Sequence, residues 1–197
     1  MARQGYTKTA LKRERDDLAL YRRFLPSLDL KRQHFQAAVE RERQQLAELE
    51  AGRQAMLDEA AEWLGLLAAD GIDGRDIVRI ADIAGGRENL LGAELPVLEE
   101  IRFERSDYSL LDAPLWMDGL VLAAEEILRL DIEVEFHHRR LAILQKELTV
   151  LTQRVNLFDK VLIPKASSTI RRINIVLGDQ ERTAVVRAKI AKKRGED

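Results

Sequence analysis

The sequence predicts an all-α-dominated protein: a long antiparallel two-helix coiled coil, with a small β-hairpin-containing insert between the helices. Apolar residues recur every seven positions over much of the C-terminal half, and a matching stripe runs through the first third. β-branched residues and glycines gather between these two stretches. We therefore expect one elongated unit with three sections: residues 1–69 as the N-terminal long helix, 70–113 as a connecting insert with short strands, and 114–197 as the C-terminal long helix.

The first helix is predicted from its seam, the row of positions that faces the partner helix. Of seventeen seam positions between Leu11 and Leu67, thirteen are apolar or aromatic. Thr7 or Thr9 is expected to cap the helix, which stops near Ala69 because a glycine-rich segment, DGIDG, follows. The polar exceptions in this seam are Glu14, Arg32, Glu42 and Arg53.

The second helix is predicted to begin near Pro114, a residue suited to a first helical turn, and to run towards Lys193. A single helix of this kind cannot bury its apolar stripe alone, so the two helices are expected to pair. Its seam consists of two series: Leu120, Ile127, Val134, Leu141, Leu148, Val155, Leu162, Thr169 and Val176; and Ala123, Leu130, His137, Leu144, Leu151 and Phe158.

Two prolines interrupt the helices. An antiparallel register that places Leu67 opposite Leu120 brings Pro26 and Pro164 to nearly the same height. Since a proline inside a helix removes a hydrogen bond and clashes with the preceding turn, both helices are expected to bend there. The original register then reaches Lys165 and Arg172, so we predict that the seam shifts to the apolar set Ala166, Ile170, Ile173 and Leu177.

The insert differs in composition from the helices. Residues 77–84 and 95–103 carry β-branched and apolar residues around Gly85, Gly86 and Gly92, which predicts a small hairpin or two short strands. Pro96 restricts its strand to an edge. The insert could be a docking element or only a connector, and its acidity favours docking.

Composition and charge limit the possible functions. The chain is 34% charged and 5% aromatic, and it has no cysteine, which indicates a reducing cytoplasm without disulfides or thiolate chemistry. No apolar run is long enough to span a bilayer. Residues 1–32 hold nine Lys or Arg and residues 160–194 hold ten, whereas residues 88–118 hold eight acids. Antiparallel pairing would bring both basic ends to one tip, with the acidic insert at the other.

No constellation supports catalysis, a cofactor or a metal. Glu135 and His138 have the E-x-x-H spacing of di-iron helical bundles, but such a site needs a second motif of this kind. The one histidine outside this segment, His34, has Lys31 three positions before it, where the motif requires a glutamate. A packed or rim role for His137 and His138 is favoured. Phosphate-binding loops and a nucleophile elbow are absent. These observations argue against an enzyme.

The basic ends leave one alternative function open: a coiled-coil binding module that grips nucleic acid with its basic tip. Acidic residues interrupt the first basic cluster, and few aromatic residues are available for stacking on bases. The favoured interpretation therefore includes no nucleic-acid partner.

Three segments resemble the D subunit, the central rotor stalk of V/A-type rotary ATPases and ATP synthases, in its bacterial form. The most specific is residues 152–194, with RVN at 154–156, VLIP at 161–164 and IRRI at 170–173. Residues 7–35 are similar to the N-terminal helix of that family, and NLLGAELPV at 89–97 is similar to its short glycine-to-proline element. The segment SLDLKRQHF carries fewer lysines than is usual in the family.

This resemblance implies a non-catalytic rotor subunit that transmits torque between the catalytic A/B hexamer and the membrane ion-translocating ring, in ATP synthesis or ion transport. The implied partners are the A/B hexamer, the F subunit of the stalk and the C subunit that forms the membrane-ring socket, without a cofactor and without direct membrane insertion. The implied location is cytoplasmic and peripheral, on the inner face of the cell membrane. Hexamer contact is expected at Lys8, Lys12, Pro26, Pro164, Arg171 and Arg172.

Overall fold

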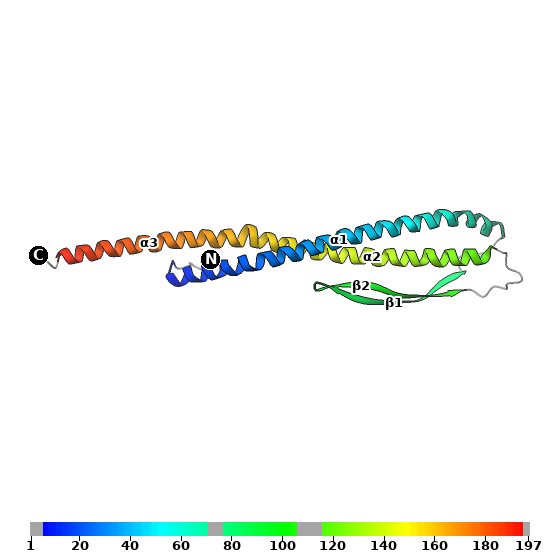
Figure 1. Cartoon of the computed structure of the whole chain (residues 1–197), viewed down its shortest axis with the longest axis horizontal. Helices are drawn as coiled ribbons and strands as arrows, with labels where there is room; N and C mark the ends of the chain where they lie inside the picture. The colour runs from blue at the N-terminus through cyan, green and yellow to red at the C-terminus, as the bar shows by residue number, and fades with distance from the viewer. Residues whose placement is uncertain (1–5, 71–76, 106–115, 195–197) are drawn as a thin grey trace. The chain divides into compact units, whose positions relative to one another are not determined.

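The computed structural model describes residues 6–70, 77–105 and 116–194 (Figure 1). A long helix, α1 (Lys8–Asp70), precedes two antiparallel strands, β1 (Val78–Leu90) and β2 (Ala93–Arg105). Helix α2 (Met117–Leu157) then continues through a π-helical turn, η2 (Phe158–Leu162), into α3 (Ile163–Arg194). The predicted fold class is confirmed. The predicted helix start near Pro114 and the DGIDG stop after position 70 lie outside the described residues.

Helix α1 begins where a side chain can satisfy its first backbone donors. The Thr7 hydroxyl oxygen accepts a hydrogen bond from the backbone N–H of Ala10 at 3.1 Å, so Thr7 rather than Thr9 caps the helix. Every seam position whose burial is described, from Leu11 to residue 60, is buried or half-buried. The stripe predicted for the first helix is confirmed as far as residue 60, and the side chains of residues 62–70 lie outside the description.

The chain groups into two compact units, and α1 contributes to both. Unit 1 contains residues 1–33 and 149–197. Within it the helices are antiparallel: Lys8 Nζ lies 3.5 Å from the Glu181 carboxylate, and the ring of Tyr21 meets that of Phe158 edge-on at 5.6 Å. This pairing brings the basic N-terminal segment beside the basic α3, as the sequence predicts.

Unit 2 contains residues 34–148, and in it the hairpin lies along α2 (Figure 1). Near the open end of the hairpin, a buried apolar cluster joins the strands to the start of α2. Farther along, Gly85 packs beside the Phe136 ring, and the Arg140 guanidinium donates to the Pro96 carbonyl at 3.1 Å. The cluster at the open end consists of Ile77, Val78, Met117, Leu120 and Val121.

The sequence predicted that the acidic insert lies at the tip of the helix pair opposite the basic ends. For the two strands this prediction is wrong, because they lie along the side of α2 (Figure 1). Two paired 13-residue strands cannot bury an apolar face by themselves, and they need a partner along much of their length. The flank of α2 supplies that partner.

The strands are longer than predicted. Gly85 and Gly86 belong to β1 and pair with Leu98 and Val97, so they do not form the turn. The chain reverses at Leu91 and Gly92, whose φ angles of 52° and 95° are both positive. Gly92 is one of the three glycines around which the hairpin was predicted, whereas a positive φ is rare for leucine. In a two-stranded sheet both strands are edges, which agrees with the edge position predicted from Pro96.

The predicted seam shift is confirmed, but its cause differs. Beyond Pro164, Ala166 and Ile173 are buried at 4% and 1% exposure, whereas Lys165 and Arg172 are exposed. The π turn that precedes the proline holds one more residue than an α-turn, and this extra residue moves the stripe by one position.

The predicted equal height of the two prolines is wrong. Tyr21 precedes Pro26 and contacts Phe158, which precedes Pro164. In an antiparallel pair the two prolines therefore lie on opposite sides of this aromatic contact. Helix α1 remains α-helical through Pro26, and the bend expected in both helices at the prolines stays a prediction.

Candidate functional site

The residues predicted to contact the hexamer all lie in unit 1 and are all exposed. Lys8 and Lys12 stand in the first two turns of α1, and Pro26 lies farther along this helix. Pro164 is the second residue of α3. Arg171 and Arg172 follow two turns later in α3.

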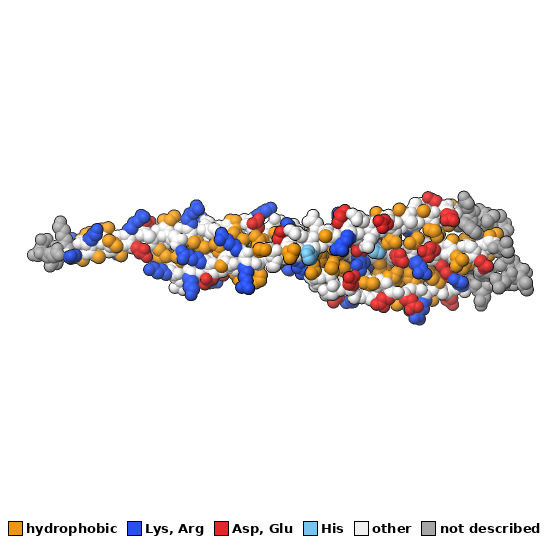
Figure 2. Space-filling model, in the orientation of Figure 1, with side chains coloured by type: hydrophobic (Ala, Val, Ile, Leu, Met, Phe, Trp, Pro, Cys, Tyr) orange, Lys and Arg blue, Asp and Glu red, His pale blue; other side chains and the backbone are white. Residues whose placement is uncertain are grey.

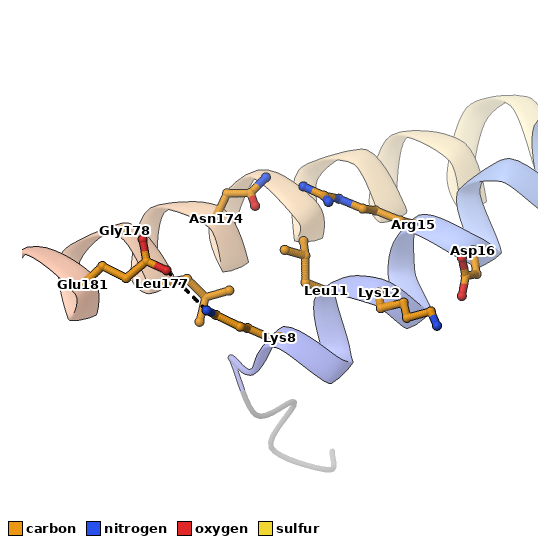
Figure 3. Close-up of a pocket in the computed structure, with 9 residues that line it drawn as sticks. All are labelled: Lys8, Leu11, Lys12, Arg15, Asp16, Asn174, Leu177, Gly178 and Glu181. Carbon is orange, nitrogen blue, oxygen red and sulfur yellow. Dashed lines mark ion pairs between the residues drawn. The ribbon is translucent and has the colours of Figure 1, made fainter.

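Lys8 and Lys12 line a cavity between α1 and α3, whereas Arg171 and Arg172 do not line it. A shallow cavity of about 460 Å³ lies between the start of α1 and α3 (Figure 3). Leu11 and Leu177 form its apolar part, and the ion pair between Lys8 and Glu181 closes one side. Its full lining is Lys8, Leu11, Lys12, Arg15, Asp16, Asn174, Leu177, Gly178 and Glu181.

Cations dominate the exposed surface of unit 1. Figure 2 shows Lys and Arg side chains spread over this unit, with fewer acids between them. The acids nonetheless reach its cavities: Asp16 and Glu181 line the first, and Glu14 and Asp17 line a second hollow beside Ile173. A surface of mixed sign suits a protein partner better than a polyanion, which would meet these carboxylates at close range.

A buried charged network in unit 2 was not predicted from the sequence. Glu42, in the seam of α1, is only 4% exposed, and its Oε1 accepts from Arg140 Nε at 3.0 Å. His137 Nδ1 lies 2.7 Å from the same oxygen. A carboxylate oxygen accepts hydrogen bonds, so the histidine tautomer with its proton on Nδ1 suits this contact.

Arg140 extends this network to the hairpin. Its guanidinium also donates to the Pro96 carbonyl and lies 3.3 Å from Glu88 Oε2, so one side chain joins α1, α2 and both strands. Two features of the sequence could have indicated the network: Glu42 is an acid at a seam position, and His137 occupies a seam position of the other helix. Nothing in the sequence pointed to Arg140.

The E-x-x-H pair does not form a joint site. Glu135 pairs with Arg139 at 2.7 Å, and His138 Nε2 lies 3.2 Å from Glu50. In the described part of the chain, no three His, Asp or Glu side chains are grouped so that they could hold a metal ion. These histidines contact carboxylates of α1.

None of the helices, over the residues described, combines the length and the apolar character needed to cross a bilayer.

Comparison with known proteins decides the family. A family model that describes the D subunit of ATP synthases matches residues 10–193. The chain belongs to the family of ATP synthase D subunits. It is 30% identical over 192 residues to the D subunit of the V-type ATP synthase of Borreliella burgdorferi, covering 98% of this chain and 95% of that protein. Its identity to the protein of the same name from Chlamydia muridarum is 35%, covering 95% and 94% of the two chains.

The segments that resemble the family's D subunits occupy distinct places in the fold. The C-terminal segment, residues 152–194, contains the end of α2, the π turn and α3. Within it Val155 and Ile173 are buried in the seam, whereas Arg171 and Arg172 are exposed. The glycine-to-proline element at 89–97 forms the turn of the hairpin and the first residues of β2. The specific segments thus include both the seam shift and the reversal of the strands.

Proposed function

We propose that this chain is the central rotor subunit of a V/A-type ATPase or ATP synthase, and that it transmits torque between the catalytic A/B hexamer and the membrane ion-translocating ring. Membership of the D-subunit family supports this proposal. The observation that carries it is the pair of antiparallel helices in unit 1, joined by a seam of many small apolar contacts. Such a seam resists twisting through dispersed packing and does not depend on a single bond.

The exposed cations of unit 1 are proposed to meet the A/B hexamer. Lys8, Lys12, Arg171 and Arg172 would provide charge, and the segments around Pro26 and Pro164 would give the surface an irregular outline. An irregular shaft can press differently on each catalytic interface as it turns. Catalysis and nucleotide binding then belong to other subunits, so this chain is proposed to be non-catalytic.

The F subunit of the stalk and the C subunit, the socket of the membrane ring, are the other proposed partners. The proposed location follows from this assembly: cytoplasmic, on the inner face of the cell membrane, and attached through the complex. The charged surface of unit 2, with its hairpin along α2, is available for such partners.

The test is a pull-down of the tagged full chain from its own cells, with the bound chains identified by mass spectrometry. Recovery of the catalytic A and B subunits supports the proposal. A preparation that lacks ATPase subunits but holds nucleic acid, and loses it steeply between low and moderate salt, would favour the alternative of a nucleic-acid-binding coiled coil.

The prolines can be tested in a reconstituted complex. Substitution of Pro164 by alanine restores a backbone N–H donor and removes the ring that crowds the preceding turn. We expect Pro164→Ala to lower the coupling between ATP hydrolysis and rotation. Coupling equal to that of the unmodified complex would count against a role for Pro164.

A further inference from the structure

One turn of unit 1 departs from α-helical geometry. In η2 the backbone N–H of Ile163 donates to the carbonyl of Phe158, five residues earlier, whereas an α-helix pairs residues four apart. Such turns are uncommon, and a single one inside a helix amounts to one inserted residue. None of the five residues of the turn is buried.

The inserted residue explains which side chains are buried in the seam before and after the turn. Before the turn, Leu151 and Val155 are buried; after it, Ala166 and Ile173 are buried. Continued α-helical spacing from Val155 would instead bring Lys165 and Arg172 to the seam. The turn thus rotates the helix by about one residue, close to 100°.

Two neighbours fix where the turn lies. Pro164 follows directly and has no N–H with which to continue the helical ladder, and its ring would clash with the carbonyl four residues earlier in a regular helix. The wider turn relieves this clash. On the other side, Phe158 packs edge-on against Tyr21 of α1.

We propose that η2 is a conformational joint: a turn whose N–H groups exchange between partners four and five residues away while the flanking seams stay packed. The basis is the combination of one extra residue, a proline that interrupts the ladder, and a turn in which no side chain is fully buried. If the chain transmits torque, the joint is the place where the helix pair twists first, and this mechanical role rests on the proposed function. The joint itself does not.

Deletion of Asp159, an exposed residue of the turn, tests the joint in the full chain. If the turn holds one residue in excess, its loss leaves a regular α-helix with Ala166 and Ile173 still in the seam. Because a regular helix would restore the clash at Pro164, the deletion is made in the Pro164→Ala chain and compared with that parent. We expect the melting temperature to stay within about 2 °C of the parent value, and the amides of residues 159–163 to exchange with deuterium about tenfold more slowly than in the parent.

Deletion of Lys146 in the same Pro164→Ala chain is the matched control, since Lys146 is likewise an exposed helical residue. No extra residue lies beside it, so Leu151 and Val155 leave the seam, and we expect a fall of about 5 °C or more in melting temperature. The joint is ruled out if deletion of Asp159 destabilises as much as deletion of Lys146. It is also ruled out if residues 159–163 of the parent exchange no faster than residues 150–156.

Both readouts use the chain without its partners. Failure of the chain to recover ATPase subunits would overturn the proposed function and leave the exchange and melting results standing. Slow exchange at η2 would overturn the joint while the rotor assignment remained.

Discussion

Glu42 shows how a buried charge is accommodated in an apolar seam. A carboxylate at 4% exposure is costly unless donors replace the water that it loses. Arg140 and His137, both on α2, provide those donors at a single oxygen. The network therefore favours one register of α1 against α2 in unit 2, because a slip of one residue would separate Glu42 from both donors.

Removal of the charge from Glu42 should cost stability. Glu42→Gln keeps the shape of the side chain but leaves Arg140 without its buried counter-charge, and we expect a loss of about 2–4 kcal/mol in the free energy of unfolding. Urea denaturation of the full chain measures it. Glu135→Gln, in an exposed pair with Arg139, is the control and should cost less than about 0.5 kcal/mol. Equal effects would contradict the importance of the buried network.

A second residue-scale prediction concerns the hairpin surface. Hydrogen bonds and charge attraction from Arg102 lower the pKa of Glu100 below its ordinary value of 4.5. A lowered pKa means that the pair favours the folded state above about pH 4.5, and that this contribution disappears as the pH falls through the lowered value.

Arg102→Ala should accordingly raise the pKa of Glu100 towards its ordinary value. The chemical shift of the Glu100 side-chain carboxyl carbon, followed by NMR as the pH is lowered, reports the midpoint of the titration. Arg87→Ala, which removes an exposed hairpin cation paired with Glu94, is the control and should leave the Glu100 midpoint where it is. An unmoved Glu100 midpoint would mean that the contact with Arg102 is not populated in solution.

Among the elements, the hairpin depends most on its neighbours. Leu95 is 1% exposed although it lies near the turn of a two-stranded sheet, where a strand partner alone cannot cover it. The adjacent Pro96 carbonyl accepts from Arg140, which places this part of β2 on α2. Packing at Leu95 thus holds the turn end, and the buried cluster around Val121 holds the open end.

Truncation of Leu95 should release the turn end of the hairpin. Leu95→Ala leaves a cavity under β2, and we expect a loss of about 2–4 kcal/mol in the free energy of unfolding, together with faster amide exchange in residues 86–97. Ile83→Ala is the control, since Ile83 is 41% exposed and should cost much less. Unchanged exchange at residues 86–97 would show that Leu95 does not anchor the turn.

The sequence predicted those elements whose signal is periodic. The two seams, a threonine cap at Thr7 or Thr9 and the shift to Ala166 and Ile173 follow from spacing that a helix imposes on any chain. Of the glycines around which the hairpin was predicted, Gly92 lies in the turn and Gly85 and Gly86 do not, and the positive φ of Leu91 runs against the preference of leucine. Pro164 marked where the seam changes, but a proline does not reveal that the preceding turn is π-helical.

The candidate site was predictable only in part. The clustering of cations at both ends of the sequence identified the exposed surface of unit 1, including Lys8 and Lys12. Contacts between distant segments were not predictable: Arg140 meets Glu42 and Pro96 across separations that no local pattern encodes. Long-range pairing of charges depends on the register of the whole assembly.

At the scale of the whole molecule, positive and negative charges are concentrated in different segments of the chain, and the fold places these segments in different units. The two basic ends of the sequence meet within unit 1, and the acid-rich strands belong to unit 2. A protein with this distribution can meet partners of different sign through its two units.

Charge reversal in unit 1 tests this division. The double variant Arg171→Glu, Arg172→Glu removes two exposed cations without touching the seam, so the melting temperature should be unchanged. We expect the recovery of catalytic A and B subunits in a pull-down to fall about tenfold at moderate salt. Arg43→Glu, an exposed cation of unit 2, is the control and should leave this recovery unchanged. Full recovery with the double variant would exclude Arg171 and Arg172 from the interface.

The pairing of Lys8 with Glu181 also has a consequence for biosynthesis. The first residues of α1 find their partner helix only after nearly the entire chain has left the ribosome. The ribosome synthesises about 5–20 residues per second, so the apolar stripe through Leu11, Leu18 and Leu25 stays without its partner helix for roughly ten seconds or longer. During this interval we expect chaperones that bind exposed apolar helices to recognise the nascent N-terminal segment.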